Sequence, residues 1–287
     1  MRFFHIALKI FVLLLVLCFV SWSLWGNNQL IAININHRSG EQNAAPAVPE
    51  ASETIPSEDP PQIEQPLVGT CTDVVVSGAV KVWIYDSPRS KVVIWNSAGV
   101  APLPSPRMVD GTLLIQGGAM DLAEDKMPWV SVFCRGVGQV IHRGKGDLTA
   151  HHLTGSHLSA ITTGEASIYI GGEGDDCHLT TSGSGDIDTS WLRVSRLSIT
   201  MSGSGYVDSN GEWTNLEVSM DGTGDLTVDS IRPAEVSVRL TGGSTAEVGQ
   251  VQALHATIQG DGKIIANGSP TILHKEILGK GTVEVRP

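Results

Sequence analysis

Glycines recur at a nearly constant spacing through the second half of the chain. Successive steps are 20, 19, 20, 19, 20, 18 and 19 residues, joining Gly144, Gly164, Gly183, Gly203, Gly222, Gly242, Gly260 and Gly279. Regular self-similarity near 20 residues is typical of a solenoid, in which every repeat forms one coil of a rod.

Apolar residues hold fixed places around each glycine, with mostly polar residues between them. Six and four positions before the glycines stand Gly138/Val140, Leu158/Ala160, Cys177/Leu179, Leu197/Ile199, Leu216/Val218, Val236/Val238, Leu254/Ala256 and Leu273/Lys275. Four and six positions after them stand Leu148/Ala150, Ile168/Ile170, Ile187/Thr189, Val207/Ser209, Leu226/Val228, Ala246/Val248, Ile264/Ala266 and Val283/Val285. A third, intermittent column contains Leu153, Leu192, Ile231 and Val251. This period of two predicts strands with one buried face.

These columns predict an all-β fold, a single-stranded right-handed parallel β-helix with rungs of ~19 residues. Three apolar columns facing one axis indicate two long sides and one short side per coil. Glycine suits the corner between the long strands because it accepts positive φ and close backbone approach. Serine and threonine beside the corner can bond the turn backbone. Right-handed winding is the default for parallel crossovers.

The segment from Val68 to Arg143 is less regular but still strand-like. VVVSGAVKVWIYDS, SKVVIWNS and TLLIQG each have the composition of strands. The prolines of VAPLPSPRM favour a loop, because proline removes a backbone donor. We interpret this segment as the opening rungs and cap of the same solenoid, with a separate small β-domain as the alternative.

The N-terminus has the pattern of an export signal. Arg2 and Lys9 precede an apolar run from Ile10 to Trp25. This run predicts that residues 1–26 form a membrane helix that acts as a signal anchor, with a cleaved signal peptide as the alternative. Residues 27–66 form an acidic, proline-rich linker, and residues 67–287 form the β-helix domain. The domain is therefore expected in the periplasm or outside the cell, anchored to the membrane; secretion is the alternative.

Composition restricts the classes of partner. The net charge of −11 makes a nucleic-acid backbone an unsuitable partner. The 32 glycines and the low aromatic content, 5%, favour a turn-rich β protein. Outside the apolar run there are three cysteines. Cys71 and Cys134 are expected to pair only if their strands are neighbours, whereas Cys177 falls on an inward position and should be buried.

The glycine-rich corners do not match known phosphate-binding loops. SGSGD has neither the spacing nor the lysine of a Walker loop, and no helix is predicted after it. GGEGDDCHL, from Gly171 to Leu179, is close to a calcium-binding repeat, but it occurs once and places His178 at the apolar position. A weak cation site near Asp175, with Asp176 and Glu173, is left open, and a solvated turn is the preferred interpretation.

Two further groups are candidates for catalytic or metal sites. His142, His151, His152 and His157 lie close in sequence, but adjacent strand residues such as His151 and His152 point to opposite faces and no tetrahedral spacing is visible. Exposed histidines are the preferred interpretation, although His142 is expected to share the strand face of Val140. Asp147, Asp186 and Asp225 take the same place in alternate repeats, about 9.6 Å apart along the rod. Such a sparse row favours turn chemistry over catalysis. The sequence therefore predicts no enzyme, and no catalytic, cofactor-binding or metal-binding residue.

The motifs VSGAVKVWI (Val76–Ile84), VDGTLLI (Val109–Ile115) and the spaced SGSGD-type corners resemble the bacterial head-GIN domain family, whose members carry the label of autotransporter adhesins. The resemblance spans roughly Val68 to Val285 and implies a β-helix fold. It implies an adhesive or structural role, although no membrane barrel follows Pro287 in this chain.

The expected function is therefore a non-enzymatic cell-envelope solenoid that binds an envelope or extracellular protein or glycan. A carbohydrate-binding or polysaccharide-degrading module is the alternative, for which Trp191 and Trp213 on neighbouring rungs would supply stacked aromatics. Burial of both would remove that support. The last strand, TVEV, leaves backbone groups open, which predicts end-to-end self-association.

Overall fold

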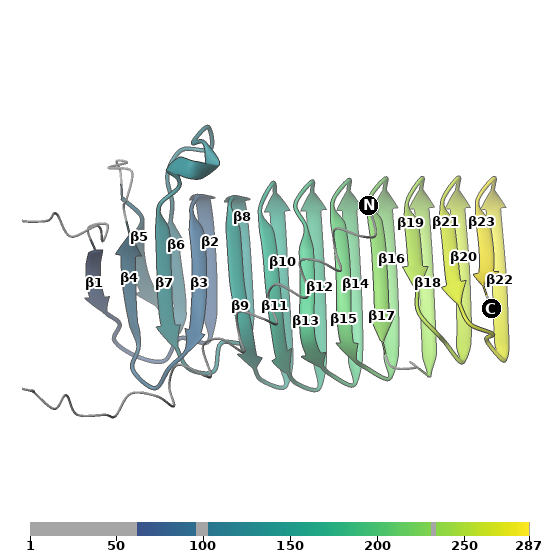
Figure 1. Cartoon of the computed structure of the whole chain (residues 1–287), viewed down its shortest axis with the longest axis horizontal. Coiled ribbons are helices and arrows are strands. Elements are labelled where there is room, and N and C mark those ends of the chain that lie inside the picture. Colours follow the sequence, from purple (N-terminus) through teal and green to yellow (C-terminus); the bar gives the residue numbers. More distant parts are fainter. Residues whose placement is uncertain (1–61, 96–102, 231–233, 287) are drawn as a thin grey trace, which may run out of the picture. The chain divides into compact units, whose positions relative to one another are not determined.

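The strands form two long sheets that face each other along a rod (Figure 1). The computed structural model describes residues 62–95, 103–230 and 234–286. In spatial order, sheet A consists of β1 (Gln62–Pro66), β4 (Lys91–Trp95), β7 (Trp129–Cys134), β3 (Lys81–Asp86), β9 (Asp147–Thr154), β11 (Ser167–Glu173), β13 (Ile187–Arg193), β15 (Tyr206–Glu212), β17 (Asp225–Ser230), β19 (Thr245–Val248), β21 (Lys263–Asn267) and β23 (Thr282–Arg286). Sheet B consists of β22 (Ile272–Gly279), β20 (Ala253–Gly260), β18 (Glu235–Gly242), β16 (Asn215–Gly222), β14 (Arg196–Gly203), β12 (Asp176–Gly183), β10 (His157–Gly164), β8 (Gln139–Lys145), β2 (Asp73–Ala79), β6 (Thr112–Gln116) and β5 (Ser105–Val109).

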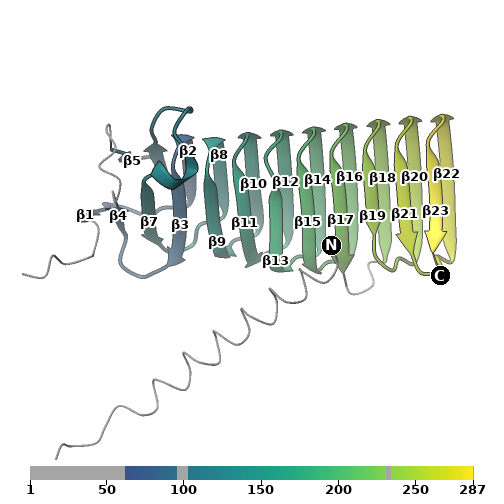
Figure 2. The ribbon, with the colours of Figure 1, turned by 45° about the horizontal axis from the view of Figure 1, so that its top comes forward.

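The all-β solenoid is confirmed, but the predicted third side is wrong. Each coil contributes one strand to sheet B and one to sheet A, and the two layers are visible in Figure 2. Leu153 and Leu192, assigned to a third side, are buried at the ends of β9 and β13 in sheet A. Val251 is buried in the turn between β19 and β20, and Ile231 lies outside the described residues.

The predicted membrane helix, residues 1–26, lies outside the described residues, as does most of the linker, whose end Gln62–Pro66 forms strand β1 of sheet A. Within the described ranges, the one helical element is the short 3₁₀ turn η1 (Glu124–Lys126), and no helix is long and apolar enough to span a membrane.

Parallel pairing places the recurrent glycines in one column. Gly183, for example, lies between Gly164 and Gly203, and all eight corner glycines align in this way. Gly183 has φ of 119°, and a Cβ there would lie 2.5 Å from the backbone oxygen of Gly164. Both the left-handed backbone and the contact between coils therefore require glycine at this position.

Buried threonines close the corners in two rungs. Thr162 Oγ1 donates to the carbonyl of Ala166 at 2.6 Å, and Thr181 Oγ1 donates to the carbonyl of Gly185 at 2.9 Å. The expected bonding of corner hydroxyls to the turn backbone is thus confirmed at these positions. Inward hydroxyls are tolerated here because each one is satisfied.

Apolar residues from both sheets form one continuous core between them. The predicted inward columns, such as Leu158/Ala160 and Leu197/Ile199, are fully buried. His142 shares the buried face with Val140, and its Nε2 lies 3.2 Å from the carbonyl oxygen of Val80. The expectation that the four nearby histidines are exposed is therefore wrong for His142, because the strand period turns it inward.

The first coils are not stacked in chain order. The β2–β3 coil lies between β6–β7 on one side and β8–β9 on the other. Antiparallel strands cover the outer end, with β4 pairing β7, β1 pairing β4 and β5 pairing β6. The prediction of a loop is therefore wrong for Ser105–Val109, because an edge strand tolerates proline. The segment before Arg143 thus lies in the same two sheets as the repeats and gives this end of the rod a mixed-strand cap.

The opposite end carries no such cap among the described residues. Leu273 and Ile277 continue the inward columns of the core, yet each is 40% exposed because no further coil covers them. Lys275 occupies the inward position between them, and its Nζ donates to the carbonyl of Val283 at 3.3 Å. An inward-pointing charge is one way in which an open strand edge is protected from pairing.

Candidate functional site

The structure separates the two tryptophans that the sequence predicted as a stacked pair. The side chain of Trp191 is 82% exposed, whereas that of Trp213 is 5% exposed. Trp191 therefore remains a candidate binding platform, whereas Trp213 is a packing residue. Both lie along the edge where each sheet A strand turns into the next sheet B strand.

A β-bulge pushes Trp191 outward. The register of β13 against β15 shifts between Thr189 and Leu192, so that Ser190 and Trp191 oppose a single residue. Trp191 has φ of 61°, a left-handed conformation that is unusual for a bulky side chain. Strained backbone of this kind is concentrated at functional sites, and here it holds the indole out in solvent.

A second bulge lies two coils away in β9. His151 and His152 together oppose one residue of β11, and both side chains are exposed. The prediction that these histidines point to opposite faces is wrong, because the bulge breaks the alternation of the strand. Both bulged strands belong to 20-residue steps of the glycine pattern, which supplies the extra residue.

Gly172 forms the floor of a hollow between the bulges, and Gly171 precedes it in β11. A Cβ on Gly171 would lie 2.2 Å from the carbonyl oxygen of Ser190, and one on Gly172 would lie 2.3 Å from that of Leu153. Side chains are therefore excluded from this floor. The hollow has a volume of about 580 Å³ and is flanked by His151 and Trp191, which is within the range of small-ligand sites.

A ladder of charged residues continues the edge. Arg193 pairs in register with Glu173 on one side and Glu212 on the other. Its Nη1 lies 3.2 Å from Glu173 Oε1, and its Nε lies 3.9 Å from Glu212 Oε2. These exposed ion pairs add little stability, but they fix the guanidinium beside the hollow.

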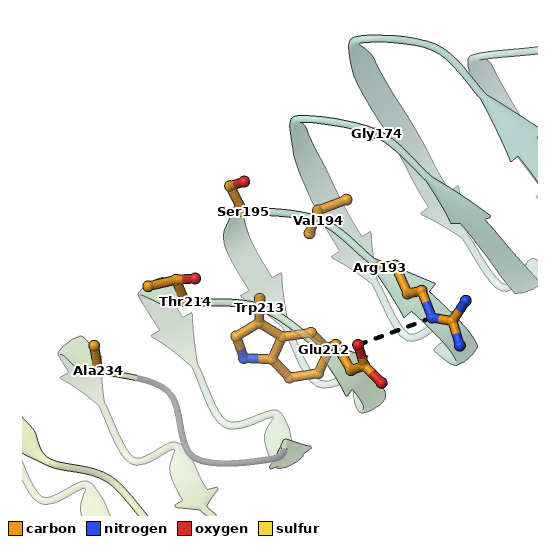
Figure 3. A pocket seen from close by; sticks show the side chains of 8 residues that line it. All are labelled: Gly174, Arg193, Val194, Ser195, Glu212, Trp213, Thr214 and Ala234. Carbon is orange, nitrogen blue, oxygen red and sulfur yellow. Dashed lines mark ion pairs between the residues drawn. The ribbon is translucent and has the colours of Figure 1, made fainter.

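Arg193 also borders a second hollow, of about 610 Å³, around Trp213 (Figure 3). The indole lies over Gly211, where a Cβ would come within 2.8 Å of Cζ3. Its buried Nε1 has no hydrogen-bond acceptor among the described residues. The shared arginine makes the two hollows neighbours along one edge of the rod.

Exposed aromatic residues also mark the outward face of sheet A. Among the described residues, every tryptophan or tyrosine that counts as exposed belongs to a strand of this sheet: Trp83, Tyr85, Trp129, Tyr169, Trp191 and Tyr206. Trp83 and Trp129 have ring centroids 5.2 Å apart, and Tyr85 stacks on Phe133 at 5.1 Å. Outward positions of sheet B carry hydroxyl residues, such as Ser198 and Thr200, together with charged residues and histidines.

Carboxylates surround two of the three tyrosines of this face, Tyr169 and Tyr206. Burial raises the pKa of Tyr169, and the charges of Asp147, Asp188 and Asp186 raise it further. Burial likewise raises the pKa of Tyr206, whose hydroxyl donates to Thr227 Oγ1 at 3.0 Å. Both phenols are therefore protonated at neutral pH and act as hydrogen-bond donors on an acidic surface.

The aspartates that repeat in alternate coils have structural contacts. Asp186 Oδ1 accepts a hydrogen bond from the backbone N–H of Tyr206 at 2.9 Å. Asp147 lies 4.0 Å from Lys81 Nζ, and burial raises the pKa of its carboxyl. These contacts agree with the interpretation of the row as turn and surface chemistry.

The candidate histidine cluster does not assemble. His157 instead bonds Asp176 on the neighbouring coil of sheet B, and His178 Nε2 lies 3.1 Å from the other carboxylate oxygen of Asp176. Burial acts in the opposite direction, but the bonds and charges of these histidines hold the pKa of Asp176 below its usual value.

The calcium-like motif divides between two sheets. Glu173 points to Arg193 in sheet A, whereas Asp176 contacts histidines in sheet B, and Asp175 lies exposed in the turn. Among the described residues, no group of three or more histidine, cysteine or acidic side chains is arranged to hold a metal ion.

The three cysteines of the domain are buried free thiols. Cys71 and Cys134 interact in the core, but Cys71 precedes β2 and lies in no strand, so the expected pairing through neighbouring strands stays a prediction. The hydrogen bond with Cys134 is the largest cause that raises the pKa of the Cys71 thiol, and burial is the second. Burial raises the pKa of Cys177 to about 12, which agrees with its predicted inward position.

Sequence reasoning missed the aromatic face and the bulges. Its signal for the face was the alternation of Trp83 and Tyr85 with apolar residues, which places both rings outward. Its signal for the bulges was the difference between 19-residue and 20-residue steps. Both signals lie in the outward residues and in the step lengths, whereas the apolar inward residues dominate the pattern.

Comparison with known proteins agrees with this architecture. Residues 72–270 match the sequence model of the family described as "Putative auto-transporter adhesin, head GIN domain". No functionally curated protein shows significant similarity to the chain. Several solved structures share the fold, and three of them come from species of Parabacteroides.

A protein of Parabacteroides distasonis named a "putative lipid binding protein" is similar with a TM-score of 0.69 and 15% identity, over 80% of this chain and 98% of that one. A "putative adhesin" of Parabacteroides merdae gives a TM-score of 0.68 and 20% identity, over 79% and 96%. A "putative adhesin" of Parabacteroides distasonis gives 0.62 and 20%, over 79% and 98%. At these identities the similarity shows the fold alone.

Proposed function

The chain belongs to the head GIN domain family, and from that membership we propose that it is a non-enzymatic adhesin-type rod that binds envelope or extracellular material. The outward face of sheet A is the proposed contact surface. The proposal includes right-handed winding of the coil, membrane attachment through residues 1–26, and exposure of the domain in the periplasm or outside the cell.

The observation that carries this proposal is the one-sided distribution of aromatic residues. Exposed tryptophans and tyrosines are concentrated on one sheet of a two-sheet rod, from β7 to β15. Aromatic side chains are enriched where proteins bind one another, because a large rigid ring buries much surface at low entropic cost. Parallel strands ~4.8 Å apart also make the face flat and long, which suits an extended partner.

A carbohydrate-binding function is the second candidate, supported by the exposed Trp191 at a hollow. Its polysaccharide-degrading form has less support, because hydrolysis needs a pair of carboxylates poised across one bond. Asp186 is engaged with the backbone of Tyr206. We therefore retain binding and not cleavage as the alternative.

Co-sedimentation of the full-length chain, in detergent, with membrane-free cell-wall particles tests the adhesive function, because the proposed membrane anchor cannot then carry the chain into the pellet. The wild-type chain should co-sediment, and a Tyr169→Ala/Tyr206→Ala variant should bind several-fold more weakly. A Thr200→Ala/Ser219→Ala variant on sheet B is the matched control and should bind like the wild type. Equal binding by all three chains, or none by the wild type, would refute the sheet A face as an adhesive surface.

A further inference from the structure

The hollow beside Trp191 has a composition that restricts its ligand. It joins a flat, solvent-exposed indole to polar groups of both kinds: the carboxylate of Glu173, the guanidinium of Arg193 and the imidazole of His151. Although His151 is exposed, its partial desolvation in the hollow and the neighbouring His152 lower its pKa, so the neutral ring offers one donor and one acceptor. A ligand that uses all these groups has an apolar face and many hydroxyl groups.

Charge argues against a strongly anionic or cationic ligand. Arg193 is already flanked by Glu173 and Glu212, and a polyanion would meet both carboxylates on a chain of net charge −11. A cationic ligand would compete with the fixed guanidinium for the same carboxylates. A neutral ligand avoids both costs and still finds donors and acceptors on opposite sides of the floor.

We propose that the edge groove formed by the β9 and β13 bulges, between His151 and Trp191, is a binding site for neutral glycans. One sugar ring stacks its C–H face on the Trp191 indole, and its hydroxyls bond Glu173, Arg193 and His151. The adjoining hollow that shares Arg193 receives the next sugar, because the two hollows follow one edge from coil to coil. This inference rests on the proposed binding function and gives it a ligand class.

The backbone of the site supports a binding role for Trp191. A left-handed conformation costs a bulky residue free energy that glycine or asparagine would not lose. If the bulge had only a structural role, glycine or asparagine at this position would make the fold more stable than tryptophan does. The indole also contributes nothing to the core, since most of its surface is in solvent.

The test measures binding of the full-length chain to a soluble neutral glucan and a soluble mannan by calorimetry, with chondroitin sulfate and polylysine as charged controls. The wild type should bind at least one neutral polymer and bind neither charged one more tightly. Trp191→Gly should weaken binding by about tenfold or more, whereas Trp191→Tyr should retain most of it. Because glycine accepts the left-handed φ, Trp191→Gly should unfold at the wild-type temperature or above it, which separates lost binding from lost fold.

Undiminished binding by Trp191→Gly, absence of binding to both neutral polymers, or tighter binding to chondroitin sulfate would each overturn the glycan site. The glycan test can fail while the wild-type chain still co-sediments and Tyr169→Ala/Tyr206→Ala does not. In that case the adhesive face would stand and only the glycan groove would be refuted. Loss of binding in Trp191→Gly together with unchanged binding in the face variant would support the groove and refute the face.

Discussion

The buried neighbours Cys71 and Cys134 lead to a specific prediction about stability. In a buffer of oxidised and reduced glutathione, the two thiols should lose two protons and two electrons, form one disulfide, and convert one oxidised glutathione into two reduced molecules. The two side chains already interact within one buried core. The link would join the chain before β2 to the end of β7 in the cap.

The size of the effect follows from the length of chain that the bond would close. The two cysteines are 63 positions apart. Chain-entropy reasoning gives about 3 kcal/mol for a 15-residue loop and about 4.7 kcal/mol for a 100-residue loop. We therefore expect the oxidised chain to be about 4 kcal/mol more stable than the reduced chain, as an upper value if native geometry is strained.

Mass spectrometry after denaturation and alkylation would check the pairing, and denaturant unfolding with and without reductant would check the stability. Cys177 is the internal control, because it should be alkylated in every sample. A Cys71→Ser/Cys134→Ser variant should show no response to reductant. Complete alkylation of both cysteines after oxidation, or pairing of either one with Cys177, would refute the reasoning.

Three further perturbations test other parts of the structure. Gly183→Ala should lower the free energy of unfolding by at least about 2 kcal/mol more than Gly136→Ala does in denaturant unfolding. Both glycines have positive φ, but only Gly183 lies against a neighbouring backbone oxygen. Equal losses of stability in the two variants would contradict the contact argument. We propose weak end-to-end association through β22 and β23. In analytical ultracentrifugation, Lys275→Ile should associate at a lower concentration than the wild type, because the substitution removes the inward charge. Identical sedimentation of the two chains, or association of neither, would count against the proposal. Burial lowers the pKa of His142, so the unfolded chain takes up a proton before the folded chain does, and stability should fall as pH drops below about 6.5 towards the lower folded pKa. His142→Met should remove that part of the acid sensitivity in unfolding curves measured between pH 7 and pH 5, and an unaltered pH profile would refute the assignment.

The repeats were predictable because each coil repeats the same local physics. Gly203 needs the same positive φ and the same close approach as Gly183, so both appear at matching positions in the sequence. Inward residues such as Leu197 must be apolar whatever their neighbours are. The register of the rod could therefore be read from spacing alone.

The first coils were not predictable in the same way. The placement of β6–β7 outside β2–β3 depends on pairing between strands far apart in the sequence, and no local pattern encodes which strand returns to which edge. The short third side failed for another reason: Leu192 follows a bulge, so an apolar residue at an odd spacing was assigned to a new face.

The candidate site was also predictable only in part from the sequence. Sequence reasoning selected Trp191 and Trp213 together, because both are tryptophans near one edge. The one-residue insertion beside Trp191 exposes it, whereas Gly211 makes room for Trp213 to fold inward. Side-chain identity was thus sufficient to nominate the residues, but the local backbone decided their roles.

The unusual stacking of the first coils has a consequence for evolution. Because β2–β3 is held between β6–β7 and β8–β9, spatial neighbours in that head are not consecutive in the chain, so deleting or copying one coil does not bring its neighbours into register. Beyond β9 each coil pairs only with the one before and the one after it. Homologues of different length should therefore share an invariant starter module and differ by whole multiples of 19 or 20 residues downstream, so that the reach of the rod is adjusted by copying coils at one end.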